Sequence, residues 1–323
     1  MRTISLEEHF VTPAFMKGPG GEIEKKARDV GGAAAKLVDA LSDIGPNRIA
    51  NMDAAGIDIQ VLSLTSPGVE QLDADEATSI ARDANDRLFS AVSNHPSRFA
   101  GFAALPTPDP KAAEKELVRC VSQYGFKGAL INGHARGIYL DNPRFWPILE
   151  CAHDLNVPIY MHPTPPPQAV ISASYAGFSE IVTYALASAG WGWHIETAIH
   201  VLRMILGGVF DRFPRLQLIV GHMGETLPAM LRRLDVMSTA MTKLERPISS
   251  YLRENVHYTF SGFNFTSAFL ALMLEVGIER IMFSADYPYA SMAAARSFLE
   301  QLPISPSDRD RIAHGNAEVL LRL

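Results

Sequence analysis

Four short apolar runs in this 323-residue chain each end in a side chain that can bind a metal ion. The four terminal residues are His9, His162, His222 and Asp286. The runs are nearly continuous in hydrophobic residues, which is typical of parallel strands buried on both faces. Imidazole nitrogens and carboxylate oxygens are common ligands of zinc and manganese(II). Ligands at the ends of strands far apart in sequence therefore predict one metal site at the C-terminal rim of a (β/α)₈ barrel.

Side-chain alternation in the first run predicts which residues face that site. Successive strand residues point to opposite faces, so we expect Ile4 and Leu6 to face the helical layer. Glu7 and His9 then share the face toward the barrel axis, whereas Glu8 points away and needs another partner. A Glu-x-His pair on one strand face supplies one carboxylate oxygen and one imidazole nitrogen.

The predicted ligand set is Glu7, His9, His162 and Asp286. Two nitrogens and two oxygens suit one divalent ion, Mn²⁺ or Zn²⁺, and the second carboxylate favours manganese. Each residue also has a structural alternative. A histidine at a strand end can be a hydrogen-bonded structural residue, Glu7 can pair with a cation, and Asp286 can form a turn. The presence of all four residues at predicted strand ends favours a metal site over these structural alternatives.

Strand-like and helix-like segments alternate along the chain and position these residues. Eight expected strands cover residues 4–9, 57–64, 99–105, 126–132, 157–162, 216–222, 257–261 and 281–286. This alternation predicts an α/β fold, a (β/α)₈ TIM barrel that forms a single domain over residues 1–323. A small-residue insertion after strand 5 is a candidate substrate cover or subunit contact. Helices are expected over residues 74–94, 110–124 and 307–323, and a long helix is expected from His222 to about Leu244. The stretch after the first strand is expected to be a long loop with a short helix.

Composition limits the possible partners and surroundings. The chain is 47% hydrophobic and 20% charged with a net charge of −6, which argues against nucleic acid as a partner. Its two cysteines indicate a reducing compartment. The N-terminal residues lack the apolar core of a signal peptide, and no apolar stretch reaches the ~18 residues that a membrane span needs. We therefore expect a cytoplasmic protein without membrane association.

Four segments carry a resemblance to a known family. They are LEEHF at residues 6–10, the stretch 196–211, GHMGE at 221–225 and FSADYPY at 283–289. Together they resemble the amidohydrolase superfamily, in particular its nonoxidative decarboxylases of γ-resorcylate, 5-carboxyvanillate and aminocarboxymuconate semialdehyde. The resemblance extends over nearly the whole chain and implies the same four metal ligands. Muconate-type members have His-x-His on strand one, so Glu7 favours the hydroxybenzoate type and manganese. Strand four offers no bridging ligand, which implies a mononuclear site.

The resemblance also implies roles for residues around the metal. His222 is a catalytic or orienting residue, and Glu225 can hold its other ring nitrogen. Asn132 and Arg233 match substrate-contacting positions, although a surface salt bridge would also explain Arg233. Tyr289 matches an aromatic position in the pocket wall, with plain packing as the alternative.

The function implied is metal-dependent nonoxidative decarboxylation of a hydroxylated aromatic carboxylic acid, possible in both directions. Asp286 is the candidate proton donor, assisted by His222 and Glu225. No organic cofactor is expected, because no Gly-rich phosphate loop follows a strand and no lysine is marked out for a Schiff base. The family forms homodimers and homotetramers. The alternatives are a metal-dependent hydrolase or hydratase of a lactone or keto-dicarboxylate on the same scaffold, and a binding protein that has lost catalysis.

Overall fold

The computed structural model describes residues 1–30 and 32–323, and parallel strands alternate with helices along them. The strands are β1 (Ile4–Phe10), β2 (Ile59–Leu64), β3 (Phe99–Gly101), β4 (Ala103–Ala104), β5 (Ala129–Asn132), β6 (Ile159–His162), β7 (Leu218–Val220), β8 (Val256–Thr259) and β9 (Ile281–Met282). They pair in parallel as β1-β2-β3 and β4 to β9 in order. β3 and β4 are one barrel strand interrupted at Phe102, and Leu6 bridges in parallel to Ser284 after β9. The predicted eight-stranded (β/α)₈ arrangement is confirmed.

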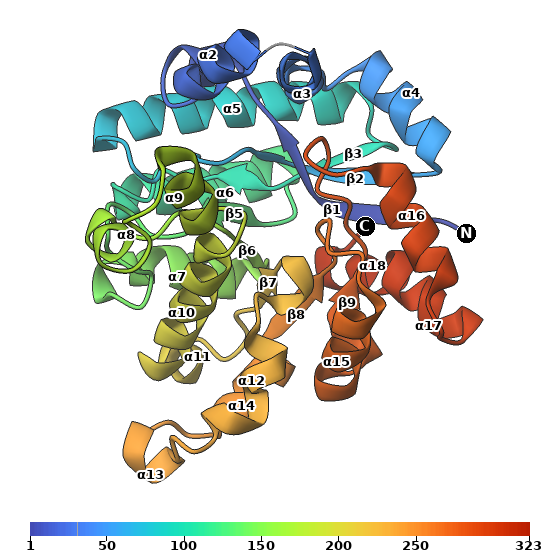
Figure 1. Ribbon diagram of the computed structural model, residues 1–323. Helices are drawn as coiled ribbons and strands as arrows, with labels where there is room; N and C mark the ends of the chain where they lie inside the picture. The colour runs from blue at the N-terminus through green and yellow to red at the C-terminus, as the bar shows by residue number, and fades with distance from the viewer. Residues whose placement is uncertain (31) are drawn as a thin grey trace.

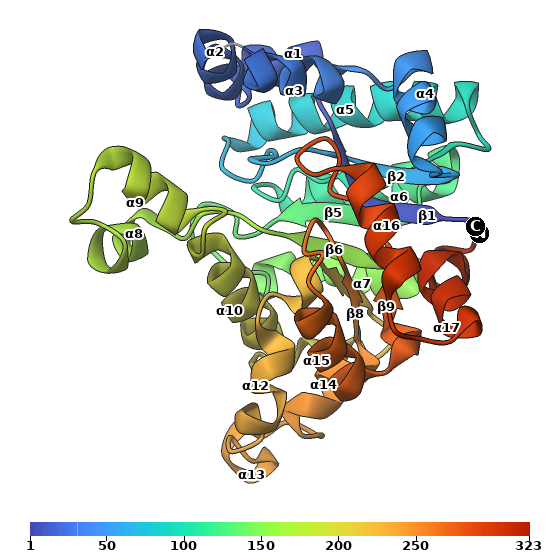
Figure 2. The same cartoon turned by 45° about the vertical axis from the view of Figure 1, so that its right-hand side comes forward.

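The helices that follow the strands lie on the outside of the sheet (Figure 1). The main ones are α4 (Pro46–Ala55), α5 (Ala74–Asn94), α6 (Pro110–Tyr124), α7 (Trp146–Leu155), α10 (Gly192–Leu206), α12 (Leu227–Leu234), α14 (Ile248–Glu254), α15 (Thr266–Val276) and α16 (Met292–Gln301). The predicted insertion after strand 5, here β6, contains α8 (Gln168–Ser174) and α9 (Glu180–Ala187). These two helices project away from the barrel (Figure 2).

Two apolar clusters hold the layers together. The larger one joins the outer faces of the strands to the helices. The smaller one fills the barrel interior and contains Ile4, Leu6, Phe102 and Tyr160, with Leu321 of α18 (Asn316–Leu321) packed against it. Each fully buried side chain of this size contributes about 1.5–3 kcal/mol.

The prediction that Ile4 and Leu6 face the helices is therefore wrong. The cause is a register shift in β1 between Ser5 and Glu8, where Glu7 adopts a φ of 64°. Such a β-bulge adds one residue to the strand and reverses the alternation. Leu6 and Glu7 consequently both reach the interior, and His9 follows on the same side, as predicted for the two ligands.

Three other segments differ from expectation. The stretch after β1, expected to be a long loop with a short helix, contains α1 (Pro13–Lys17), α2 (Gly21–Val30) and α3 (Gly32–Ser42). The long helix expected after His222 is divided, because α12 ends at Leu234 and only α13 (Thr239–Thr242) follows. The C-terminal helix comprises α17 (Pro306–Asp310), a π-helical turn and α18. Among the described residues, no helix combines the length and apolar character needed to span a bilayer.

Candidate metal centre

The structure brings the four predicted ligands together at the C-terminal ends of the strands. The ligand atoms of Glu7, His9 and His162 all lie within 4.8 Å of one another. His162 Nε2 is 3.5 Å from Glu7 Oε1, and His9 Nε2 is 3.3 Å from Asp286 Oδ1. Residues from β1, β6 and the loop after β9 therefore meet at one point, although almost the whole sequence separates them.

The Glu7 carboxylate is held by one of its two oxygens. The hydroxyls of Tyr160 and Ser261 both donate to Oε2, whereas Oε1 has no hydrogen-bond partner among the described residues. Gly221 makes room for this arrangement, because a Cβ there would lie 2.5 Å from Glu7 Oε2. Tyr160 was not predicted as a site residue, yet its position two residues before His162 places it on the same strand face and could have indicated it.

His162 is oriented by a backbone carbonyl. Its Nδ1 donates to Pro163 O at 2.9 Å, so Nε2 is directed with its lone pair toward Glu7. Burial, reinforced by the neighbouring charges of His9 and His222, lowers the pKa of His162 well below its usual value. A neutral imidazole is the form that binds metal ions.

These donors fit a divalent cation. Glu7 Oε1 and both ring nitrogens of His9 are buried without hydrogen-bond partners in the described chain, and buried unpaired polar atoms are costly, at about 1–3 kcal/mol each. Burial raises the pKa of Glu7, so the surrounding protein disfavours its charged form. A cation there would reverse that effect and satisfy the unpaired atoms. The mixed nitrogen and oxygen set is appropriate for manganese(II) or zinc.

Glu8 points away from the metal centre, and its carboxylate accepts hydrogen bonds from other groups. Its Oε1 accepts from Ala285 N at 2.9 Å, and its Oε2 accepts from Tyr287 N at 3.2 Å and Gln60 Nε2 at 3.1 Å. Burial raises the pKa of Glu8 to about 8. The two backbone bonds flank Asp286, whose φ of 66° is uncommon for a residue other than glycine. Glu8 thus fixes the backbone from which Asp286 projects.

His222 lies at the edge of this cluster. Its Nε2 is 3.9 Å from Glu7 Oε1, and its Nδ1 donates to Glu225 Oε1 at 2.7 Å, as the sequence led us to expect. Burial alone would lower the pKa of His222, but the charges of Glu225 and Glu7 outweigh it and raise the value to about 10. The other oxygen of Glu225 is bound by His194, which lies 31 residues earlier in the chain.

The three predicted substrate residues occupy different settings. Asn132 ends β5 directly beside His162, and its buried Oδ1 has no partner within the described chain. Glu70 fixes Asn132 by accepting from its backbone N at 2.7 Å. The ring of Tyr289 lies 5.5 Å from that of His9 and its hydroxyl shares a hydrogen bond of 2.6 Å with Thr65. Arg233 lies in the last turn of α12 with an exposed side chain, so its role as a substrate contact stays a prediction.

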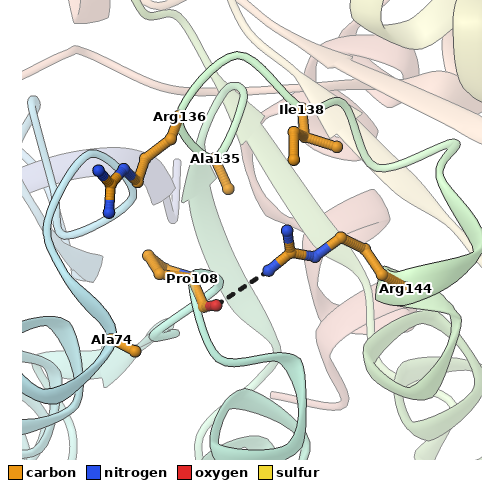
Figure 3. A pocket seen from close by; sticks show the side chains of 6 residues that line it. All are labelled: Ala74, Pro108, Ala135, Arg136, Ile138 and Arg144. Atoms are coloured by element: carbon orange, nitrogen blue, oxygen red, sulfur yellow. Dashed lines mark hydrogen bonds between the residues drawn. The ribbon is translucent and has the colours of Figure 1, made fainter.

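A separate cavity of about 360 Å³ lies among the loops at the same end of the strands. Arg136 and Arg144 approach it from opposite sides, with Pro108 between them (Figure 3). Arg144 donates to Pro108 O at 3.0 Å, and Arg136 pairs with Asp73. The candidate metal ligands do not line this cavity, so it is distinct from the metal centre.

A parallel barrel with imidazole and carboxylate groups converging at its C-terminal rim defines the class of metal-dependent (β/α)₈ enzymes. Residues 36–323 match the family described as amidohydrolase. The chain belongs to this family.

Several relatives of this chain are decarboxylases. The γ-resorcylate decarboxylase of Polaromonas sp. is 37% identical over 332 residues, which cover 99% of this chain and 98% of the relative. A crystal structure of 2,6-dihydroxybenzoate decarboxylase in complex with 2,6-dihydroxybenzoate is 37% identical, with a TM-score of 0.89 and 100% of both chains covered. The 5-carboxyvanillate decarboxylase of Novosphingobium aromaticivorans, with manganese and 4-hydroxy-3-methoxy-5-nitrobenzoic acid, is 34% identical, with a TM-score of 0.91 over 100% of this chain and 96% of that one.

Proposed function

We propose that this protein is a metal-dependent nonoxidative decarboxylase of a hydroxylated aromatic carboxylic acid, with all 323 residues in one domain. The observation that carries the proposal is the cluster of Glu7, His9 and His162, whose ligand atoms lie within 4.8 Å of one another, with Asp286 Oδ1 3.3 Å from His9 Nε2. Relatives similar over the whole chain decarboxylate hydroxybenzoates, and two of the solved structures hold such an acid or its nitro analogue. A small aromatic carboxylate is therefore the substrate class.

We propose the metal ligands to be Glu7, His9, His162 and Asp286. When bound, a divalent ion supplies positive charge that stabilises the carboxylate and phenolate oxygens of the substrate. Two carboxylates in the set favour manganese over zinc, and manganese is present in the 5-carboxyvanillate decarboxylase. No organic cofactor is required for this chemistry.

The chain's own side chains have the following proposed roles. The Asp286 carboxyl delivers a proton to the ring carbon that bears the substrate carboxylate, after which the carbon–carbon bond breaks and CO₂ leaves. His222, held by Glu225, faces the same space and assists the proton transfer. Asn132 presents its unpaired Oδ1 to a hydroxyl of the substrate, Tyr289 lines the wall, and Arg233 pairs with a carboxylate at the entrance.

A panel of acids with manganese- or zinc-loaded protein tests this proposal. The panel contains 2,6-dihydroxybenzoate, 5-carboxyvanillate and benzoate as a control without hydroxyl groups, and CO₂ release is measured. We expect release from at least one hydroxylated acid, none from benzoate, and carboxylation of the phenol product at high bicarbonate. Hydrolysis of a lactone without CO₂ release from any acid would contradict the proposal and indicate a hydrolase.

We also propose a homodimer or homotetramer whose contact includes the α8–α9 insertion. Phe178, Ile181 and Val182 are exposed there, and Glu180 is the one charged residue between 168 and 193. An apolar, nearly uncharged surface suits a second copy of the chain better than nucleic acid or a charged partner.

The unpaired thiols of Cys120 and Cys151 fit the reducing cytoplasm.

A further inference from the structure

We infer that His194 is a positioning residue, which fixes the carboxylate of Glu225 and thereby the orientation of His222. The inference rests on the proposed function, because it assumes that His222 acts on the substrate. His194 lies in the first turn of α10, shortly after the α8–α9 insertion, and its side chain is buried. It belongs to a different segment of the chain from His222 and Glu225, which share the loop after β7.

Glu225 joins the two imidazoles, with one oxygen for each. Its Oε1 lies 2.7 Å from His222 Nδ1, and its Oε2 lies 2.5 Å from His194 Nδ1. Glu225 is almost fully buried. An ionised carboxylate only accepts hydrogen bonds, so both Nδ1 atoms must carry a proton and donate. Without His194, Oε2 would be left buried and unpaired at a cost of about 1–3 kcal/mol.

The far side of the His194 ring supports the same assignment. Trp193 Nε1 and Ala189 O each lie 3.1 Å from His194 Nε2. A neutral ring accepts from the Trp193 indole, which can only donate, and a charged ring donates to the Ala189 carbonyl. In either state Nδ1 donates to Glu225. The position of His194 is further fixed by Phe263, whose ring packs 5.2 Å from that of His194 and 5.3 Å from that of His222.

His194, His222 and Glu225 have donor types that could also bind a second metal ion. The distances argue against this reading. A bound zinc lies about 2.0–2.2 Å from each nitrogen or oxygen, and tetrahedral angles then separate the ligand atoms by more than about 3 Å. Separations of 2.5 and 2.7 Å are those of charge-assisted hydrogen bonds.

The consequence for His222 is a fixed proton on Nδ1 and a fixed ring direction, whether or not Nε2 also carries a proton. With both carboxylate oxygens engaged, Glu225 cannot rotate, so His222 keeps its proton on Nδ1 and directs Nε2 toward Glu7 and the metal centre. These hydrogen bonds also connect the base of the projecting insertion to the loop that carries His222, because α10 carries His194 and follows α9 directly.

Two substitutions and one control test this inference. His194→Phe keeps the ring volume without either nitrogen, and His194→Asn retains an amide donor near the position of Nδ1. The control is His314→Phe, since His314 forms a similar pair with Glu318 at 3.0 Å on a C-terminal helix. Each protein is measured for kcat and KM, Mn²⁺ affinity, thermal stability and the His222 Nδ1–H resonance of ¹⁵N-histidine-labelled, zinc-loaded protein without substrate.

We expect His194→Phe to lower kcat about 10- to 100-fold, as loss of a supporting partner does, with KM and Mn²⁺ affinity within about two-fold of wild type. The His222 Nδ1–H resonance should shift or disappear in His194→Phe, and His194→Asn should recover part of both properties. Wild-type kcat and an unchanged resonance in His194→Phe would overturn the inference. Equal losses of kcat in His194→Phe and His194→Asn, in proportion to their losses of thermal stability, would also overturn it. If the wild type released no CO₂, the proposed function would fail, and the resonance would still decide the role of His194.

Discussion

At the residue scale, the candidate metal centre depends on which oxygen of the Glu7 carboxylate is left without a hydrogen bond. The ligands could be predicted because each ends an apolar run, and strand ends of a barrel converge. The residues that hydrogen-bond to these ligands could not be predicted, since they depend on a bulge in β1 and on the side chains of neighbouring strands. Tyr160 and Ser261 engage one oxygen of Glu7 and leave the other toward His162. The contact between His194 and Glu225 could not be predicted either, because 31 residues separate them in the sequence.

Removing one of these hydroxyls should weaken metal binding. Tyr160→Phe deletes a donor to Glu7 Oε2, so the carboxylate can rotate away from the metal position. We expect Mn²⁺ affinity, measured by equilibrium dialysis, to fall about 10- to 100-fold. The matched control is Tyr258→Phe, because the Tyr258 hydroxyl is equally buried but donates to Leu252 O. Equal affinities in the two variants would exclude a supporting role for Tyr160.

Substitutions of Asp286 and His222 should distinguish the residues that bind the metal from those that act in catalysis. Asp286→Asn removes the proposed proton donor, and we expect turnover to disappear. His222→Ala should keep one Mn²⁺ per chain while losing activity by at least about 100-fold, the lower range of general acid–base contributions. Metal analysis with CO₂ release measures both. Full activity of Asp286→Asn would exclude it as the donor, and metal loss from His222→Ala would make His222 a ligand.

At the element scale, the α8–α9 insertion is where the chain departs most from a plain barrel. Ile181 is 76% exposed on α9, as is Leu274 on α15. If the insertion forms the subunit contact, Ile181→Glu should shift the protein toward smaller species in light scattering after size-exclusion chromatography. Leu274→Glu adds the same charge at equal exposure and should leave the assembly unchanged. An unaltered assembly in Ile181→Glu would place the contact elsewhere.

Helix α10 also carries a group that makes stability depend on pH. Burial, with the charges of His134 and Arg203, lowers the pKa of His200 to about 3, and its Nε2 accepts from Leu140 N at 2.9 Å. A lowered histidine pKa gives stability that is complete above the unfolded value of about 6.5 and is lost as the pH falls toward 3.

Metal-free wild type should therefore lose up to about 1.4 kcal/mol per pH unit more than His200→Gln between pH 6 and 4. Urea unfolding at several pH values measures the difference. Leu202→Ala on the same helix changes packing without a titrating group, so it should keep the wild-type slope. Parallel curves for wild type and His200→Gln would show that His200 does not cause this dependence.

At the scale of the whole molecule, the barrel could be predicted from the alternation of apolar runs and amphipathic helices, and α5 and α6 have the predicted bounds. The parts that could not be predicted depend on irregular backbone. The loop after β7 has positive φ at His222, Met223, Glu225 and Thr226, which prevents the continuous helix that its composition suggested. Arg233 consequently lies at the end of a short helix, with an exposed side chain.

The most direct test titrates Mn²⁺ into metal-free protein and records bound metal and CO₂ release from 2,6-dihydroxybenzoate and 5-carboxyvanillate in the same samples. The account predicts that both rise together for at least one acid and saturate at one ion per chain, with neither in Glu7→Gln at the same Mn²⁺ concentrations. Full CO₂ release from the metal-free protein, or saturation with one ion and no release from either acid, would contradict it.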